Sequence, residues 1–109
     1  TPDAAPASTS GGLWLRAGPG AAGWLASSGL DVLSLANNHT WDWGPQGAAE
    51  TRQRLDELGL GSAGYGPDAS SAWSASVTSV KGLRVAVIAA VCAPPDDPGC
   101  FASRYAPRP

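Results

Sequence analysis

The sequence predicts an α/β fold with layered packing, and three observations support this prediction. Apolar runs of strand length alternate with segments of helical period along the chain. The turn-forming residues, 14 glycines and 10 prolines, separate these segments. With 43% hydrophobic and 15% charged residues, the 109-residue chain has the composition of one small globular domain. Helices that alternate with strands favour a sheet with helices packed on its faces.

The first expected helix covers residues 21–28, directly after a Pro-Gly break. Pro19 suits a first helical position, and Gly29 suits the left-handed residue that closes a helix. Four side chains at helical spacing share one face of it, namely Ala21, Trp24, Leu25 and Ser28. A short apolar run at residues 30–36 follows, and it predicts a strand covered on both faces that ends at Asn37.

The strongest helical pattern begins at Gln46 or a neighbour, just after Pro45, and ends at Gly59. Glu50 and Arg54 are predicted to form an ion pair on its solvent side, because residues four apart are neighbours on a helix. The predicted inward stripe of this helix consists of Ala48, Thr51 or Arg52, Leu55 and Leu58.

The remaining pattern is mostly of β type. Residues 60–66 favour a short strand and a turn, and Pro67 starts a short helical turn. Residues 77–80 and 83–91 flank a Lys-Gly connection and predict a hairpin. Its second strand is almost wholly apolar and is therefore expected at the centre of a sheet. With only about four strands the sheet is expected to be incomplete, as in one part of a larger domain.

The two ends of the chain differ in composition from its middle. Residues 1–12 are predicted to be a flexible lead-in, residues 13–91 the folded segment, and residues 92–109 a Pro- and Asp-rich loop and tail. Because the chain does not start with Met, we expect a processed product or an excerpt. Cys92 and Cys100 either form a disulfide, which would imply an oxidising compartment, or remain two thiols.

Charge argues against a nucleic-acid or anionic-membrane partner, and hydropathy argues against a transmembrane segment. The net charge is −2, and the seven Lys and Arg residues are scattered rather than gathered into a stripe. A nucleic-acid or anionic-membrane binder needs such a stripe to neutralise phosphates, so we expect no nucleic-acid partner. No run of eighteen or more apolar residues exists, so no transmembrane segment is expected in this chain.

One short stretch, ANNHTWDWG at residues 36–44, gathers polar and aromatic side chains between the first strand and the longest helix. In open α/β sheets, ligands bind at such strand ends. His39 can serve as a metal ligand, a general acid or a donor to a phosphoryl oxygen. The side-chain oxygen of Asn38 can bind a metal, or its amide can donate a hydrogen bond. Asp42 follows His39 by three residues and is close enough to orient the imidazole.

Each of these residues also has a structural interpretation. A lone histidine such as His39 is often a satisfied loop residue, and two adjacent asparagines are common in turns. Asp42 could cap the following helix. Trp41 and Trp43 are expected to pack over the site or the core rather than stack on a ligand. The amides that open the following helix would favour a bound anion.

The stretch SLANNH, followed by D-x-G at residues 42–44 and by a helix that ends in L-x-x-L-G, resembles CapA-type capsule synthesis proteins. These are the poly-gamma-glutamate capsule proteins of the calcineurin-like metallophosphoesterase superfamily. The resemblance runs from about Leu15 to Val91 and includes VKGLRVAVIAAV. It implies a layered α/β sandwich of metallophosphoesterase type, with a divalent metal pair (Mn, Zn or Fe) at the strand ends.

The resemblance also implies roles for three residues. Asn38 corresponds to a metal ligand, and His39 to the histidine that contacts the phosphoryl group and protonates the leaving oxygen. Thr40 stands where an acidic residue often follows this histidine, so Asp42 is the candidate for the orienting role. The family's other ligands come from a Gly-Asp segment, an acidic segment and C-terminal histidines, none of which is in this chain. The metal site is therefore expected to be incomplete, and the isolated chain inactive.

The resemblance implies a part of a protein of capsule or poly-gamma-glutamate synthesis or export with a metal-dependent phosphoester hydrolase site. Its expected partners are capsule-synthesis or membrane components, and its expected location is extracellular or at the cell surface, with a membrane anchor in the parent protein left open. The alternative is a non-catalytic cell-surface or scaffold module that keeps the fold without a complete metal site. A small secreted domain whose tryptophans contact carbohydrate is a further alternative.

Overall fold

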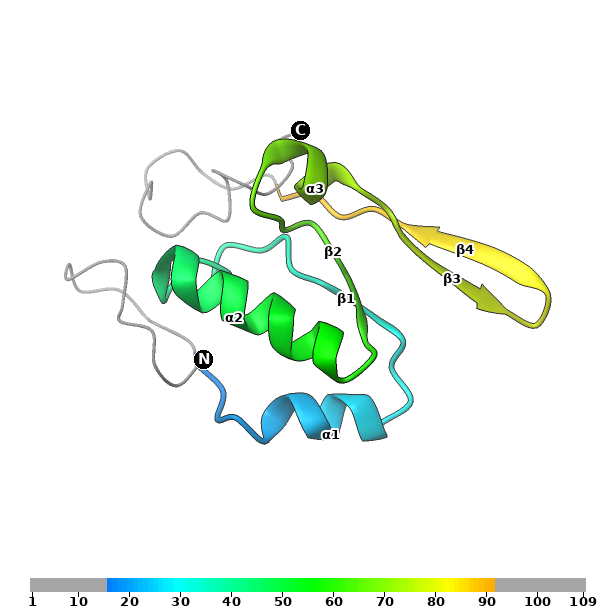
Figure 1. Ribbon diagram of the computed structural model, residues 1–109, viewed down its shortest axis with the longest axis horizontal. Helices are drawn as coiled ribbons and strands as arrows, with labels where there is room; N and C mark the ends of the chain where they lie inside the picture. The colour runs from blue at the N-terminus through cyan, green and yellow to red at the C-terminus, as the bar shows by residue number, and fades with distance from the viewer. Residues whose placement is uncertain (1–15, 92–109) are drawn as a thin grey trace.

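The computed structural model describes residues 16–91 (Figure 1). The predictions for the lead-in at residues 1–12, for the tail at residues 92–109 and for the pairing of Cys92 and Cys100 lie outside the described residues. Within the described range, the elements in order are α1 (Ala21–Ser27), β1 (Val32–Ser34), α2 (Gly44–Glu57), β2 (Gly61–Ala63), α3 (Ala69–Trp73), β3 (Ser76–Val80) and β4 (Leu83–Val87). Each predicted helix and strand is found in the predicted order, which confirms the α/β class.

The first two strands and α2 form one βαβ unit. β1 and β2 pair in parallel, with Val32 opposite Gly61 and Ser34 opposite Ala63. The amide of Leu35 donates to the carbonyl of Ala63 at 2.8 Å and extends this pairing just past the strand ends. Parallel strands need a long crossover between them, and α2 supplies it. The metallophosphoesterase type of layering stays a prediction, because the described strands form only two two-stranded sheets.

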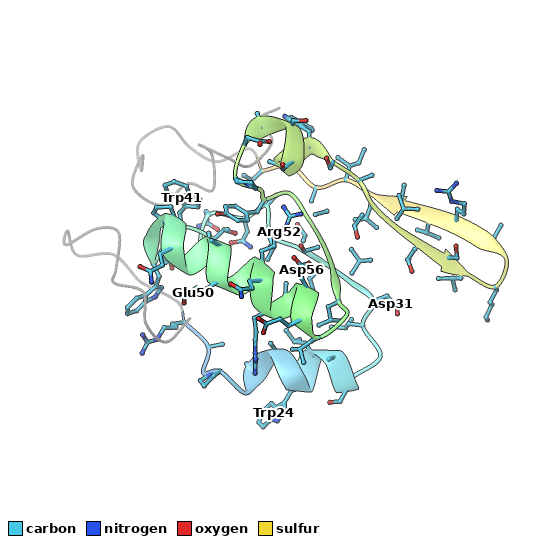
Figure 2. All side chains as sticks on the ribbon, viewed as in Figure 1. Trp24, Asp31, Trp41, Glu50, Arg52 and Asp56 are labelled. Atoms are coloured by element: carbon cyan, nitrogen blue, oxygen red, sulfur yellow. The ribbon has the colours of Figure 1, made fainter. Side chains whose placement is uncertain are left out.

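A small core lies between α2 and the β1–β2 pair. Its buried members are Leu35, Ala48, Leu55, Leu60 and Tyr65, with Leu25, Leu33 and Trp41 packed partly against them. The predicted α2 stripe is confirmed at Ala48 and Leu55, which are buried. Of the two alternatives for its middle position, Thr51 is exposed and Arg52 is half-buried, and Leu58 is also half-buried. α1 contributes no fully buried residue, and Trp24 lies on its side away from α2 with 81% of its surface exposed (Figure 2).

The start of α2 and one of its ion pairs differ from the predictions. The helix begins at Gly44, before Pro45, because a proline in the first turn lacks only an N–H that has no intrahelical partner there. The Glu50–Arg54 pair was predicted and is wrong. Glu50 instead accepts a hydrogen bond from Gln46 at 2.8 Å, and Arg54 contacts Glu57 at 3.4 Å.

β3 and β4 form an antiparallel hairpin, with Ser76 opposite Val87 and Val80 opposite Leu83. The hairpin extends away from the α2 and β1–β2 body (Figure 1). The central position predicted for the second strand is wrong within the described residues, because β4 pairs only with β3 there. Leu83 and Val85 are therefore 69% and 42% exposed. An apolar run shows that a strand is suited to burial, but a second neighbour is needed to bury it.

None of the helices between residues 16 and 91 has the length and apolar character needed to cross a bilayer.

Candidate functional site

The loop between β1 and α2 is held by hydrogen bonds to its own backbone. The Asn37 side-chain oxygen accepts from the amide of His39 at 2.9 Å, which is the turn chemistry expected of this asparagine. The hydroxyl of Thr40 donates to the carbonyl of Leu35, at the end of β1. The first bond closes the turn before His39, and the second links the residue after His39 to the end of β1.

His39 and Asp42 contact each other directly. The Nδ1 atom of His39 lies 2.9 Å from Oδ2 of Asp42. Asp42 is 1% exposed, whereas the imidazole of His39 is 35% exposed. An ionised carboxylate only accepts hydrogen bonds, so Nδ1 carries the proton and Nε2 is the ring nitrogen that can meet a ligand. The structure thus brings together the two residues predicted to act as a proton donor and its orienting partner.

Two structural interpretations of these residues can be compared with the geometry. Asp42 is not the N-cap residue of α2, because Trp43 occupies that position, and it forms no side-chain cap hydrogen bond. Trp41 packs partly against the core, as expected. The first turn of α2 contains no acidic residue, so the partial positive charge of the helix N-terminus is not offset there by a carboxylate of that turn.

Asn38, the predicted metal ligand, is exposed beside His39. Among residues 16–91, no three side chains of the His, Cys, Asp or Glu type cluster closely enough to hold a metal ion. A catalytic divalent metal needs at least three protein ligands of suitable geometry. The described residues therefore do not fit a self-contained metal centre, and Asn38 remains a predicted single ligand.

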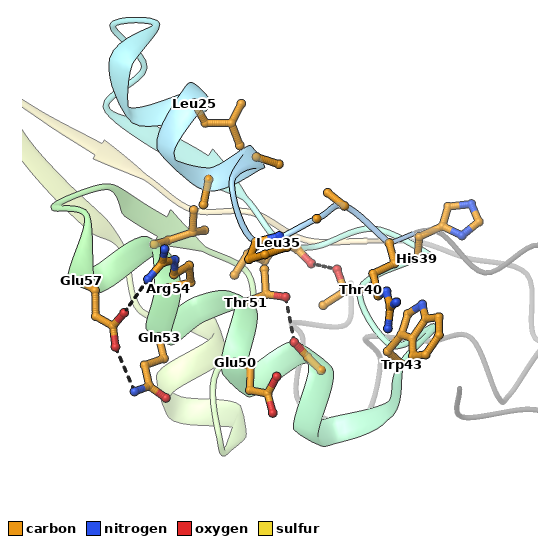
Figure 3. A pocket seen from close by; sticks show the side chains of 18 of the residues that line it. Leu25, Leu35, His39, Thr40, Trp43, Glu50, Thr51, Gln53, Arg54 and Glu57 are labelled. Atoms are coloured by element: carbon orange, nitrogen blue, oxygen red, sulfur yellow. Dashed lines mark hydrogen bonds and ion pairs between the residues drawn. The ribbon is translucent and has the colours of Figure 1, made fainter. Parts of the chain in front are cut away.

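A cavity of about 590 Å³ opens between α1, α2 and the loop that carries His39 (Figure 3). Leu25, Leu35 and Leu55 give it an apolar wall, while His39, Thr40 and Trp43 line one end. Concave sites of 300–1,000 Å³ with an apolar lining and a few polar groups are typical of small-molecule binding. His39 thus lies at a cavity large enough for a small ligand.

Two arginine contacts were not predicted from the sequence, one made by Arg16 and one by Arg52. The Cζ atom of Arg16 lies 4.4 Å from the ring centroid of Trp43. Nη1 of Arg52 donates to the carbonyl of Tyr65 at 2.5 Å and ties α2 to the segment after β2, and Arg52 lies on that side of α2 in Figure 2. Trp43, which Arg16 contacts, lies 27 positions later in the sequence, so no local motif could indicate this contact. Only the tertiary structure shows the pairing.

Comparison of the sequence with known proteins shows which family the chain belongs to. Residues 1–104 match the sequence model of the family described as bacterial capsule synthesis protein PGA_cap. The chain belongs to this family. The strand, polar loop and helix that carry Asn38, His39 and Asp42 lie inside the matched range, so the resemblance to CapA-type capsule synthesis proteins is confirmed.

Two relatives of this PGA_cap chain come from Sinorhizobium fredii (strain NBRC 101917 / NGR234). They are the uncharacterized proteins y4sH and y4uA, each 38% identical to the chain over 64 residues. The matched segment covers 59% of the chain but only 14% of each relative. The chain therefore corresponds to a small part of these relatives, and the family match associates it with capsule synthesis.

Proposed function

We propose that this chain supplies the proton-donating part of a metal-dependent phosphoester hydrolase site in a capsule synthesis protein. The contact between His39 and the buried Asp42, at the end of β1 and beside a cavity, is the observation that carries the proposal. In this proposal the protein acts in the synthesis or export of a capsule polymer such as poly-gamma-glutamate, outside the cell or at its surface.

The chemistry follows from the two nitrogens of His39. With Nδ1–H held by Asp42, a proton on Nε2 is directed away from the carboxylate and toward a bound ligand. When the P–O bond of a phosphoester breaks, the leaving oxygen gains negative charge and takes this proton, and the ring returns to its neutral form. The Asp42 carboxylate balances the charge of the ring while it carries two protons. General acid catalysis of this kind typically contributes about 10²- to 10⁴-fold in rate.

Asn38 is proposed as one ligand of a divalent metal pair (Mn, Zn or Fe) in the full-length protein. Such a pair would stabilise negative charge on the phosphoryl oxygens. The remaining ligands are proposed to come from other segments of the longer protein, since the described residues do not form a centre alone. Capsule-synthesis or membrane components are the proposed partners. A membrane anchor elsewhere in the parent protein would be consistent with these partners.

The proposal is tested in the full-length protein that carries this chain. Phosphodiesterase activity is measured with added Mn or Zn for the wild type, His39→Ala and the surface control Arg84→Ala on β4. We expect His39→Ala to lower kcat about 100-fold or more and the control to keep wild-type activity. Unchanged activity in His39→Ala would sink the catalytic assignment.

A non-catalytic scaffold module is the second candidate function. It is favoured by the exposed position of Asn38 and by the lack of a three-ligand cluster among residues 16–91. Elemental analysis of the purified full-length protein separates the two candidates. The hydrolase proposal expects about two equivalents of tightly bound divalent metal. A metal-free protein that shows no phosphodiesterase activity with any added metal would favour the scaffold.

A further inference from the structure

We propose that the cavity beside His39 binds a linear aliphatic chain, and that the substrate is a phosphoester of a long-chain aliphatic alcohol. Binding of the chain depends on the cavity alone, whereas the identity of the substrate rests on the proposed function. The apolar wall of Leu25, Leu35 and Leu55 then has a role of its own, because it contacts the group that leaves as the alcohol.

The cavity is elongated, because it follows one side of α2. Its lining residues on and next to this helix run from Trp43 to Glu57, and the 14 residues of α2 span about 21 Å. In Figure 3, His39 and Trp43 lie at one end of the cavity and Glu57 at the other, with Leu35 between them. A volume of about 590 Å³ spread over this length suits an extended chain better than a compact ring system.

Three elements supply the apolar wall of the cavity. Leu25 comes from α1, Leu35 directly follows β1, and Leu55 lies on α2. Leu35 and Leu55 are buried, whereas Leu25 is half-buried and keeps part of its side chain exposed. Moving an aliphatic chain from water onto such a wall is favourable, and the gain grows with the apolar area that is buried. Binding should therefore strengthen with chain length.

Charge does not favour an anion along this cavity. Two positive and two negative side chains line it and balance one another, namely Arg16, Arg54, Glu50 and Glu57. The buried Asp42 adds one negative charge beside His39, and the imidazole offsets this charge only while the ring carries two protons. Because the cavity has no excess of positive charge, the part of the ligand that fills it is uncharged. The phosphoryl group stays at the His39 end, near the proposed metal pair.

The proton-donor role of His39 decides which part of the substrate lies in the cavity. Hydrolysis breaks a P–O bond, the electron pair goes to the leaving oxygen, and water adds to the phosphorus. The leaving oxygen takes the proton of Nε2, so it contacts His39, and the group attached to it extends along the cavity. That group departs as an alcohol, and the leucine wall favours a long aliphatic one.

Isothermal titration calorimetry of the full-length protein with straight-chain alcohols, from 1-butanol to 1-octanol, tests binding of the chain. Affinity is expected to rise about fourfold for each added methylene, because each one removes more apolar surface from water.

Three variants of α1 test where the chain binds. Leu25→Ala is expected to weaken octanol binding about tenfold, because the wall loses one of its leucines. Ala22→Phe places a ring at another position that lines the cavity and is expected to prevent octanol binding. Trp24→Ala is the matched control, because Trp24 is on the same helix but is 81% exposed on the side away from α2. This control is expected to keep wild-type affinity.

Four outcomes would overturn binding of the chain: no octanol binding by the wild type, an affinity that does not change with chain length, equal losses in Leu25→Ala and Trp24→Ala, or wild-type affinity in Ala22→Phe. A cavity filled by another segment of the full-length protein would give the first of these outcomes. The chain-length series uses only the wild type, so it stays decisive if a variant fails to fold, as judged by circular dichroism.

The substrate class is tested separately, with methyl alkyl phosphodiesters whose alkyl chain is the leaving group. In the wild type, kcat/KM is expected to rise with the length of this chain, and Leu25→Ala is expected to flatten the rise. Hydrolysis that depends on His39 but not on chain length would refute the substrate class and leave the proposed function standing. Octanol binding by a protein that hydrolyses none of these esters would refute the proposed function, and the substrate class with it, but not the chain site.

Discussion

One contact organises the candidate site at the residue scale, the 2.9 Å hydrogen bond between Nδ1 of His39 and the buried Asp42. With the carboxylate at Nδ1, Nε2 is the ring nitrogen that can meet the proposed ligand. The spacing of three residues was enough to predict that the two side chains could meet. The partial exposure of the imidazole could not be predicted, because it depends on how the loop folds against α2.

Asp42→Ala is expected to change the tautomer of His39. Without a carboxylate at Nδ1, the neutral ring should revert toward the Nε2–H form that is usual in solution, and 15N chemical shifts of the imidazole measure this change. Loss of the buried bond is also expected to lower the free energy of unfolding by about 1–3 kcal/mol. Asp42→Asn serves as the matched control, because its amide oxygen can still accept from Nδ1–H. An unchanged tautomer in Asp42→Ala would contradict the assigned proton position.

The elements themselves follow from local sequence. Pro45 and Gly59 mark the two ends of α2, and the alternation around the Lys81-Gly82 connection specifies the β3–β4 hairpin, so these boundaries could be predicted within a few residues. Local sequence did not predict which of its near neighbours on α2 each charged side chain contacts, because several residues three or four positions apart compete there. It also did not predict the exposure of β4, which depends on which segments pack together.

Gly64, just after β2, is expected to tolerate no side chain. Its φ is +92°, and a Cβ there would lie 2.5 Å from Cβ and 2.9 Å from the amide nitrogen of Ala36, at the start of the candidate site loop. Gly64→Ala should therefore lower the free energy of unfolding by both backbone strain and a backbone clash. Gly59→Ala is the matched control, because its φ is +74° but nothing lies within 4 Å. Urea denaturation should show Gly64→Ala less stable than the control by about 1–3 kcal/mol, and equal losses would count against this packing.

Asp68 caps α3, and this cap is expected to depend on pH. Its side chain accepts a hydrogen bond from the amide of Ser71 at 2.7 Å, and this bond lowers the pKa of the Asp68 carboxyl below its usual range. Since the folded pKa is lower than the unfolded one, the cap stabilises α3 above about pH 4 and is lost as the pH falls through the folded value. Hydrogen exchange of the Ser71 amide should accelerate in acid relative to its intrinsic rate. Asp68→Asn, which caps without ionising, should remove that pH dependence, and its persistence there would refute the mechanism.

At the scale of the whole molecule, the chain is a member of a capsule synthesis family. Its 64-residue match to each Sinorhizobium relative covers 14% of that relative. The described part has a small core and an exposed apolar hairpin. The family and the α/β class could be predicted from a short motif and its surrounding periodicity. A metal centre stays a proposal, because the described residues supply no cluster of three ligands. The tests of the proposed function therefore use the full-length protein.

The most direct measurement compares two phosphodiester substrates in the full-length protein, one with a nitrophenolate leaving group and one with an alkoxide leaving group. A nitrophenolate leaves without being protonated, whereas an alkoxide needs a proton from a general acid. If His39 supplies that proton, His39→Ala should lower kcat/KM about 100-fold or more for the alkyl ester and much less for the nitrophenyl ester. Equal losses for both substrates, or no loss for either, would contradict the role of His39 as the proton donor.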